Sequence, residues 1–191
     1  MVAIYWVYEI RPIVGIQTFK VQTTSNDPTF QPGDCLVADM SAYKNRMPDY
    51  GDIVIFTRPD GHMYSFRVVG RPNDNLELKD NIVTINGKSG KANFIKETNS
   101  GEMSVTEFEE ELPNGHKHFI YKFKQPFDST KSNINNILVP PNSYYLLGDN
   151  RDNAADSRYE GFVNIKRIKG RIVYSYWGQT ANRINIDFRD K

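Results

Sequence analysis

The sequence of 191 residues has little of several features that mark common protein classes. Its single cysteine, Cys35, excludes an internal disulfide and a cysteine-rich zinc site. The formal net charge is +1, from 24 basic and 23 acidic residues, so charge gives no reason to expect a nucleic-acid partner. No segment keeps the helical period of about 3.6 residues over a long stretch, which argues against a helical protein.

A long apolar run is also missing, and the N-terminal residues 1–8 come nearest to one. They are apolar and aromatic, but Glu9, Arg11 and Pro12 interrupt the run well before the ~20 residues that cross a bilayer. The stretch also lacks the small-residue cleavage site of a secretory signal. From its residues alone it is an edge strand, or an interfacial segment with aromatic side chains at the boundary.

Aromatic residues and turn-forming residues are plentiful. Aromatics make up 13% of the sequence, which favours strands over helices. Short apolar segments at residues 35–38, 53–56 and 63–69 are separated by glycine, proline and asparagine, which mark turns. Residues 76–85 alternate about a central turn and predict a hairpin. The sequence therefore predicts a mainly β fold built from sandwich or barrel-like sheets.

Residues 88–136 differ from their surroundings by being polar. They contain an acidic run at 107–111, which we expect to form a solvated face. His116 and His118 would share one face of a strand, but no cysteine or carboxylate has matching spacing. We therefore expect surface histidines and no metal site. The block predicts an inserted β-rich cap between two parts of a core, residues 19–87 and 137–191.

The stretch 144–163, YYLLGDNRDNAADSRYEGFV, is the most informative part of the chain. It opens with a run typical of a buried strand and then carries charged residues of both signs. These are Asp149, Arg151, Asp152, Asp156 and Arg158. Because an unpaired buried charge is costly, we expect a paired and hydrogen-bonded network. Taken alone, the stretch predicts a salt-bridged turn that pins two strands.

The candidate nucleophile lies in residues 19–34, FKVQTTSNDPTFQPGD. Taken alone, Ser25 before an Asn-Asp-Pro turn is a turn-capping hydroxyl. However, the segment aligns without gaps on the serine motif of type I signal peptidases, roughly FKIPSGSMxPTLxxGD. The later GDNRDNxxDSRxxGFV closely resembles the C-terminal motif of the same family. Residues 51–56 and 67–74 match the two family segments between these motifs, in the family's order.

Type I signal peptidases are membrane-bound serine proteases that remove signal peptides from exported proteins. The resemblance covers nearly all of residues 19–177. It implies a signal peptidase I-like antiparallel β-sheet core with an inserted β-rich cap subdomain at 88–136. Because a membrane anchor precedes the catalytic domain in this family, it also makes residues 1–18 the remnant of an anchor. As written, the N-terminal run is too short to span a bilayer.

The resemblance places Ser25 on the catalytic serine and Thr23 on the hydroxyl residue that helps to form the oxyanion hole. Asn26 replaces the usual methionine. Other retained positions support the active-site architecture in the family. These are Asp149, Arg151, Asp156, Ser157, Arg158 and Arg67.

The match departs from the family at the general base. In the family a neutral lysine takes the serine proton, and a serine of the last motif holds that lysine. Here the lysine position is Phe66 and the serine position is Ala154. Arg67 cannot substitute, because a guanidinium stays protonated at ordinary pH. Glu160, where the family has tryptophan, is a further departure.

The sequence therefore supports two functions of different class. The first is a catalytically impaired family member that binds exported preproteins, signal peptides or a partner signal peptidase. The second is an active serine endopeptidase in which Lys20 or a lysine of the insertion activates Ser25. A structural β domain is a third interpretation. The resemblance implies no cofactor and no metal, contact with a membrane surface, and a location on the extracytoplasmic (periplasmic) side of a bacterial cytoplasmic membrane.

Overall fold

The computed structural model describes residues 15–126 and 128–189. Within these ranges the strands form three sheets whose paired strands are antiparallel, and each helix is about one turn long. The prediction of a mainly β, antiparallel fold is confirmed. The helical turns are α1 (Ser129–Ser132), α2 (Ser157–Glu160), η1 (Ile165–Arg167) and η2 (Ala181–Arg183).

The largest sheet of the described chain has the strand order β1-β2-β14-β3-β4-β12-β13, and β15 pairs with β14. Its strands are β1 (Ile16–Lys20), β2 (Cys35–Asp39), β3 (Ile53–Thr57), β4 (Met63–Gly70), β12 (Ser143–Leu147), β13 (Val163–Asn164), β14 (Ile168–Trp177) and β15 (Ile186–Asp187). The strands predicted at 35–38, 53–56 and 63–69 are all present, each one residue longer than predicted.

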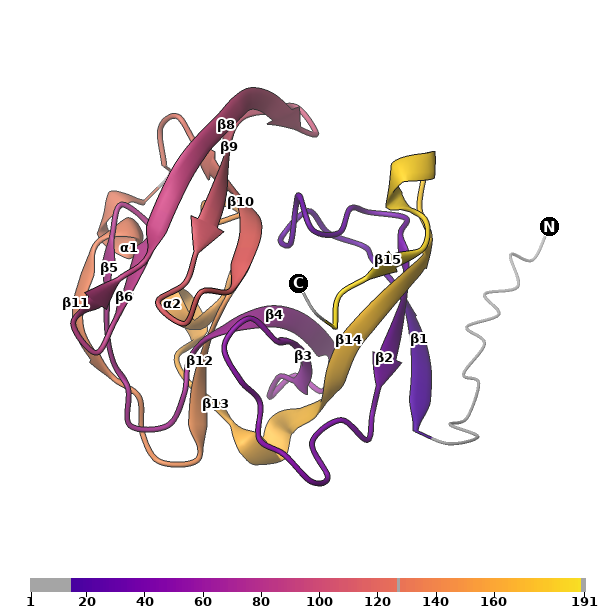
Figure 1. Cartoon of the computed structure of the whole chain (residues 1–191), viewed down its shortest axis with the longest axis horizontal. Helices are drawn as coiled ribbons and strands as arrows, with labels where there is room; N and C mark the ends of the chain where they lie inside the picture. Colours follow the sequence, from indigo (N-terminus) through magenta and orange to yellow (C-terminus); the bar gives the residue numbers. More distant parts are fainter. Residues whose placement is uncertain (1–14, 127, 190–191) are drawn as a thin grey trace.

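Two smaller sheets lie to one side of the largest sheet (Figure 1). One has the order β11-β5-β6-β7 and the other has the order β10-β9-β8. Their strands are β5 (Asn75–Lys79), β6 (Ile82–Ile85), β7 (Lys88–Ser89), β8 (Lys91–Ser100), β9 (Met103–Glu111), β10 (Lys117–Phe123) and β11 (Ile134–Leu138). The predicted hairpin at 76–85 is β5 and β6, joined by Asp80 and Asn81 with positive φ angles of 49° and 64°.

The sheet β8–β10 is called the cap below. The strands at the two ends of the predicted insertion, β7 and β11, pair with β6 and β5 rather than with the cap. The four-stranded sheet is therefore shared between residues 75–89 and 134–138. The division of the chain into 1–18, a core of 19–87 and 137–191, and an insertion of 88–136 remains a prediction.

β12 lies between two clusters of buried apolar side chains. Because successive side chains of a strand point to opposite faces, Tyr145 and Leu147 pack in one cluster and Tyr144 and Leu146 in the other. The first cluster contains side chains of β5 and β6, and the second contains side chains of β3 and β4. All five residues of β12 are buried, so this strand joins the two halves of the core.

The predicted anchor remnant lies largely outside the described residues, which begin at position 15. Its described part includes most of β1, an edge strand of the largest sheet that pairs with β2. Among the described residues, no helix is both long enough and apolar enough to cross a membrane.

Candidate active site

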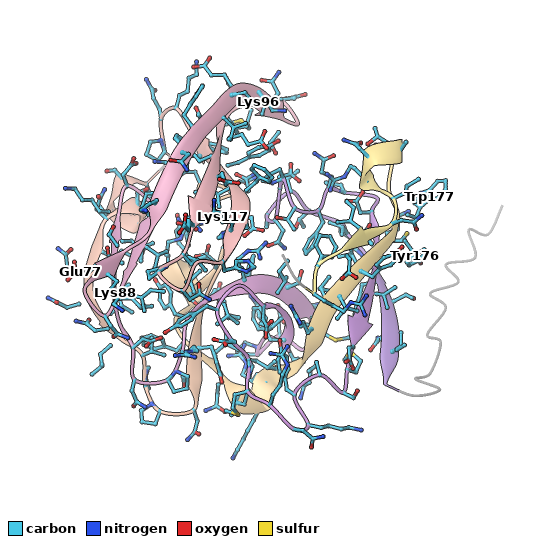
Figure 2. The ribbon with its side chains drawn as sticks, in the orientation of Figure 1. Glu77, Lys88, Lys96, Lys117, Tyr176 and Trp177 are labelled. Atoms are coloured by element: carbon cyan, nitrogen blue, oxygen red, sulfur yellow. The ribbon has the colours of Figure 1, made fainter. Side chains whose placement is uncertain are left out.

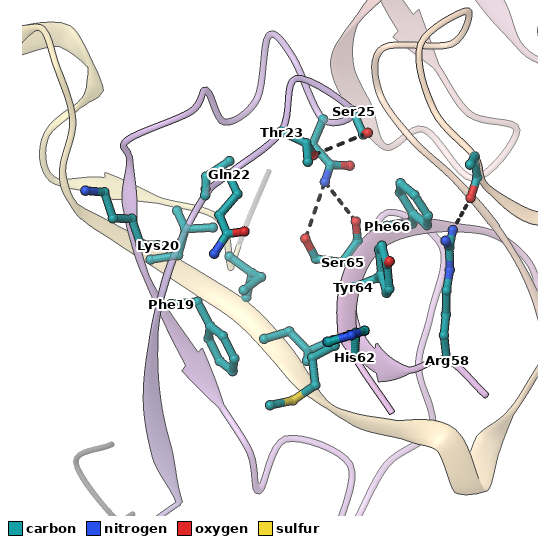
Figure 3. A pocket seen from close by; sticks show the side chains of 17 residues that line it. Phe19, Lys20, Gln22, Thr23, Ser25, Arg58, His62, Tyr64, Ser65 and Phe66 are labelled. Atoms are coloured by element: carbon teal, nitrogen blue, oxygen red, sulfur yellow. Dashed lines mark hydrogen bonds between the residues drawn. The ribbon is translucent and has the colours of Figure 1, made fainter. Parts of the chain in front are cut away.

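Ser25 lies in the loop that joins β1 to β2. Two backbone hydrogen bonds close the base of this loop, from Val21 N to Asp34 O and from Gly33 N to Val21 O, each 2.9 Å long. Ser25 is half-buried. The Thr23 hydroxyl donates a hydrogen bond to Ser25 Oγ over 3.3 Å (Figure 3). The two hydroxyl groups indicated by the resemblance are therefore adjacent.

Two asparagine residues fix the main chain around Ser25. The backbone N–H of Asn150 donates to Ser25 O and its side-chain Nδ2 donates to Thr24 O, both over 3.1 Å. On the other side, Asn26 Nδ2 donates to Ser65 O in β4 over 2.8 Å. The loop is therefore held between the last motif and β4, and Asn26 makes a polar bridge that a methionine could not make.

The tip of the cap also touches the serine loop. Ser100, the last residue of β8, donates its hydroxyl to the buried carboxylate of Asp27 and accepts from Asn150 Nδ2 at 3.3 Å. Burial raises the pKa of Asp27 to about 6, against the hydrogen bond from Ser100, which lowers it. The cap is thus connected to the loop that carries Ser25.

A cavity of about 410 Å³ opens beside Ser25, a size typical of ligand sites. Leu36, Ile55 and Ile172 contribute apolar side chains to it from β2, β3 and β14. One side is lined by the end of β1 and the serine loop, and the other by β4 and the turn before it (Figure 3). A peptide could therefore lie over the face of the large sheet and pass Ser25.

Phe66 and Ala154 meet next to the main chain of Ser25. Both are buried, with 3% and 6% of their surface exposed, and they belong to the same apolar cluster. A Cβ atom on Gly148 would overlap Ala154 Cβ and Ser25 O and would lie 3.3 Å from Phe66 Cε1. Gly148 is therefore the close-approach position that lets these three residues pack together.

Neither Lys20 nor Arg67 is placed to activate Ser25. Lys20 is the lysine among the cavity-lining residues of the described chain, and Figure 3 shows its amine directed away from Ser25. The Arg67 guanidinium instead binds Asp149 through two hydrogen bonds of 2.8 and 2.7 Å. Arg67 Nη1 also donates to Gly51 O over 2.9 Å. Arg67 is therefore part of a buried ion pair.

Comparison with known proteins identifies the family. The family model described as "Signal peptidase, peptidase S26" matches residues 1–177. The chain belongs to the type I signal peptidase family. The signal peptidase I of Rickettsia typhi is 34% identical over 158 residues, which cover 74% of this chain and 59% of that protein. This chain thus spans about three fifths of the length of that relative.

Two further relatives of this signal peptidase family member match other shares of the chain. The signal peptidase IB of Staphylococcus aureus is 27% identical over 182 residues, which cover 92% of this chain and 86% of that protein. The crystal structure of a signal peptidase I from Enterococcus faecalis covers 66% of this chain and 97% of its own, with 25% identity and a TM-score of 0.40.

The charged residues of the signal peptidase C-terminal motif are paired or hydrogen-bonded, as the sequence predicts, and Asp152 accepts hydrogen bonds from Asn81 Nδ2 and Phe123 N. Arg158 binds Asp156 through hydrogen bonds of 2.8 and 2.7 Å, and Asp149 binds Arg67. Burial opposes ionisation of Asp149, but the Arg67 guanidinium and its hydrogen bonds lower the pKa of that carboxyl below its usual value. The partners of Asp149 and Arg151 come from β4 and the cap, and not from the motif itself.

The same motif fixes the end of β12. Asp156 accepts a hydrogen bond from Gly148 N at 3.0 Å, and Ser157 Oγ accepts one from Leu146 N at 3.0 Å. The side chain of Asp156 also caps α2 by accepting from Arg158 N. These contacts hold the strand that presents Gly148 to Ser25.

The expectation that the acidic run 107–111 forms a solvated face is wrong for Glu107 and Glu110, which are both buried. The expectation of surface histidines is wrong for His118, which is buried with its Nε2 3.1 Å from Glu110 Oε2. Glu110 also binds Arg151 of the last motif. Burial opposes ionisation of Glu110, but Arg151 and His118 lower its pKa to about 2. The inner face of the cap is therefore part of the charged network.

The two cap histidines have different partners in this network. His116 Nε2 lies 3.2 Å from Arg67 Nη1. Burial is the largest cause and the nearby Arg67 charge the next, and together they lower the pKa of His116 to about 3. Burial likewise lowers the pKa of His118. Both histidines are therefore neutral near pH 7, which lets them lie beside an arginine.

Sequence reasoning missed Glu110, His118, Asn150 and Gly148 as residues that shape the site. The sequence did contain a signal for Glu110 and His118. Each lies two residues from an apolar residue of its strand, Phe108 and Ile120, so each shares a strand face with that apolar side chain. Glu110 and His118 are also direct cross-strand neighbours in the β9–β10 ladder. Asn150 and Gly148 lie in the last motif, but they carry no charge, and their contacts with the serine loop depend on the fold.

Proposed function

We propose that this signal peptidase family member binds exported preproteins or signal peptides in the cavity beside Ser25 but is catalytically impaired. The observation that carries the proposal is the packing of Phe66 against Gly148, where Ala154 also packs. In the family pattern these two positions hold the lysine base and its serine partner. An apolar ring and a methyl group supply neither a base nor a hydroxyl.

The chemical argument rests on the general base. A serine hydroxyl is a weak nucleophile until a neighbouring base takes its proton. General acid–base assistance contributes ~10²–10⁴-fold to a rate, so losing the base removes at least that assistance. Phe66 and Ala154 form a coherent pair, because a serine facing a phenylalanine ring would have lost its hydrogen-bond partner.

Peptide binding is supported by an open strand edge next to the serine loop. Within the described chain, β12 pairs with β4 only from Arg67 to Gly70, whereas β3 pairs with β4 from Met63. Residues 63–66 therefore pair with a strand on one side only, and on this segment Asn26 Nδ2 already binds Ser65 O. An extended peptide can pair with such an edge by strand addition, with its side chains in the cavity.

The alternative is an active serine endopeptidase in which another lysine activates Ser25. The retained hydrogen bond between Thr23 and Ser25 favours this alternative, because a pure scaffold has no evident need for either hydroxyl. Against it, the Lys20 amine points away from Ser25 (Figure 3). Lys96 and Lys117 of the insertion lie on the cap and pair with its glutamates (Figure 2).

The same proposal includes the surroundings in which the protein acts. By membership of the family, we place it at a membrane surface, on the extracytoplasmic side of a bacterial cytoplasmic membrane. A partner signal peptidase is a further candidate for what it binds, since an impaired member that keeps a peptide groove could act beside an active one. Neither nucleic acid nor a cofactor is part of the proposal.

The experiment compares the protein with its Ser25→Ala variant on a labelled signal-peptide substrate. We expect little cleavage above the variant, while both proteins bind the peptide with similar affinity. Peptide binding is measured by fluorescence anisotropy and cleavage by mass spectrometry of the products. Robust turnover that disappears in Ser25→Ala would establish the active peptidase instead. No binding by either protein would reject the peptide groove.

A further inference from the structure

Apart from Tyr64, the ionisable side chains that line the cavity beside Ser25 are basic. Lys20, Arg58 and His62 line it, and within the described chain none of its lining residues is an aspartate or a glutamate. The whole sequence is nearly balanced, with 24 basic and 23 acidic residues, so this local excess is not a property of the composition. The cavity therefore lacks its own counter-charge.

Arg58 is the best placed of these basic side chains. Its guanidinium stacks on the ring of Tyr64, with 3.8 Å from Cζ to the ring centroid, and Nη2 donates to the carbonyl oxygen of Ala155. Figure 3 shows Arg58 on the same side of the cavity as Tyr64 and Phe66. A guanidinium that is already held in place loses little side-chain freedom when it binds a carboxylate.

The carboxylates near Arg58 leave Nη1 free to bind another acid. Glu160 Oε1 lies 3.9 Å from Nη1, which is too long for a hydrogen bond, and 52% of the Glu160 side chain is exposed to water. Asp60 accepts a hydrogen bond from His62 N over 2.8 Å and does not line the cavity. Neither group therefore neutralises Arg58 from inside the cavity.

The surroundings strengthen a charge interaction at this point. The ring of Phe66 lies next to Arg58, with 6.0 Å from its centroid to Cζ, and the apolar side chains of Leu36, Ile55 and Ile172 also line the cavity. An ion pair formed beside apolar groups is screened less by water than one on an open surface.

We propose that the cavity selects extended peptides that carry an acidic side chain, with the peptide carboxylate paired to Arg58. This inference rests on the proposed function, because it takes the cavity to be a peptide site. Arg58 is then a specificity-determining residue, and Lys20 adds positive potential along the same cavity. The apolar side chains from β2, β3 and β14 accept the uncharged side chains that flank the acid.

The test uses alanine- and serine-rich fluorescent peptides, each with one glutamate at a different position, and a matching set with glutamine. At one position we expect the glutamate peptide to bind about tenfold more tightly than its glutamine match, as for a charge-assisted pair. Arg58→Gln should remove this preference, so that the variant binds the glutamate peptide and its glutamine match with equal affinity. Arg58→Lys should restore part of it. Arg167→Gln, a control outside this cavity, should keep it.

The outcomes separate this inference from the proposed function. Equal binding of glutamate and glutamine peptides by the unaltered protein would overturn the charge selection and leave the peptide groove standing. A glutamate preference that survives in folded Arg58→Gln would also overturn it. No binding of any peptide would reject the groove itself, and the selection with it.

A second measurement covers the case in which Arg58→Gln does not fold. Lys20 is exposed on β1, so Lys20→Gln should fold, and it should reduce the glutamate preference by about twofold. Raising the salt concentration should reduce the preference of the unaltered protein further. A preference that changes in neither experiment would overturn the proposal.

Discussion

Arg151 of the C-terminal motif and Glu110 of the cap form an ion pair in which both side chains are completely buried. Arg151 Nη1 also donates to Glu110 Oε1 over 3.1 Å, so the pair has two contacts. His118 Nε2 lies 3.1 Å from Glu110 Oε2. The pair therefore joins residues far apart in the sequence, and it connects the cap to the motif that positions Ser25.

The first prediction concerns this pair. Glu110→Ala leaves the Arg151 charge buried without its partner, which costs about 3–5 kcal/mol in comparable pairs. We expect a fall of that size in the free energy of unfolding, measured by urea denaturation. The control is Glu109→Ala on the same strand, whose carboxylate forms a looser contact of 3.7 Å with exposed Lys117. Its cost should stay below about 1 kcal/mol.

The pH dependence of the same pair gives a further check. The folded-state pKa of Glu110 is lowered to about 2 from the usual value of 4.5. The carboxylate therefore contributes stability above pH 4.5, and that contribution is lost as the pH falls toward 2. Equal loss of stability in Glu110→Ala and Glu109→Ala would show that the buried pair does not hold the cap.

The second prediction concerns Phe66 and Ala154. Phe66→Lys places an amine in a buried, apolar position beside Ser25, where burial should depress its pKa and make the neutral base available. Without a hydroxyl at position 154 the amine is poorly oriented, and misplacement can cost about a hundredfold in rate. We expect no gain from Ala154→Ser, little from Phe66→Lys, and clearly more than the sum from both together.

The assay for this pair is signal-peptide cleavage, with Ser25→Ala introduced into each variant as the background. Peptide binding and circular dichroism confirm that the double variant is folded and occupied. If it binds peptide and still cleaves no faster than its background, Ser25 is not poised as a nucleophile. The family's active site would then not apply to this chain.

The third prediction follows from Asp27. Its folded-state pKa is raised from 3.8 to about 6 because burial disfavours the charged form. The free-energy cost of burying the ionised carboxylate is absent below pH 3.8, grows as the pH rises to 6, and reaches its full value above pH 6. Asp27→Asn removes the charge. Its gain in the free energy of unfolding over the unaltered protein should therefore be larger at pH 8 than at pH 4, by an amount of the order of 2 kcal/mol.

The measurement for Asp27 is urea denaturation at both pH values. Asp60→Asn makes the same chemical change at an exposed position, and we expect no comparable gain from it at pH 8. A pH-independent effect of Asp27→Asn would mean that Asp27 is not held as a buried acid between the cap and the serine loop.

The fourth prediction concerns the N-terminal residues. If residues 1–8 are the remnant of a membrane anchor, their aromatic side chains should bind lipid vesicles. Deleting residues 1–10 should then abolish vesicle binding, measured by co-sedimentation, without unfolding the β core. Equal binding by the shortened protein would place the membrane contact elsewhere.

The sequence predicted those parts of the site that depend on local order along the chain. Strand β12 and the turn after it were visible because buried apolar residues precede a dense group of charges. The need for pairing was also predictable, since unpaired charge is costly to bury. The partners were not predictable, because Asp149 binds Arg67 from β4 and Arg151 binds Glu110 from the cap.

Glu110 shows the physical limit of this kind of prediction. Its period of two with Phe108 indicates which face of β9 it occupies, but nothing local to that strand identifies its partner, Arg151 of the last motif. Asn26 is similar, because its role depends on the carbonyl group of Ser65 in β4. Both residues were visible in the sequence, but neither contact could be derived from it.

The position of β12 between two apolar clusters determines how the protein opens. Loosening either cluster would uncover one face of this strand and expose side chains such as Leu146 or Leu147 to water. The amide protons of β12 should therefore exchange with solvent only when the whole domain unfolds. Asn150, which follows this strand, would then hold the backbone of Ser25 from the most slowly exchanging part of the molecule.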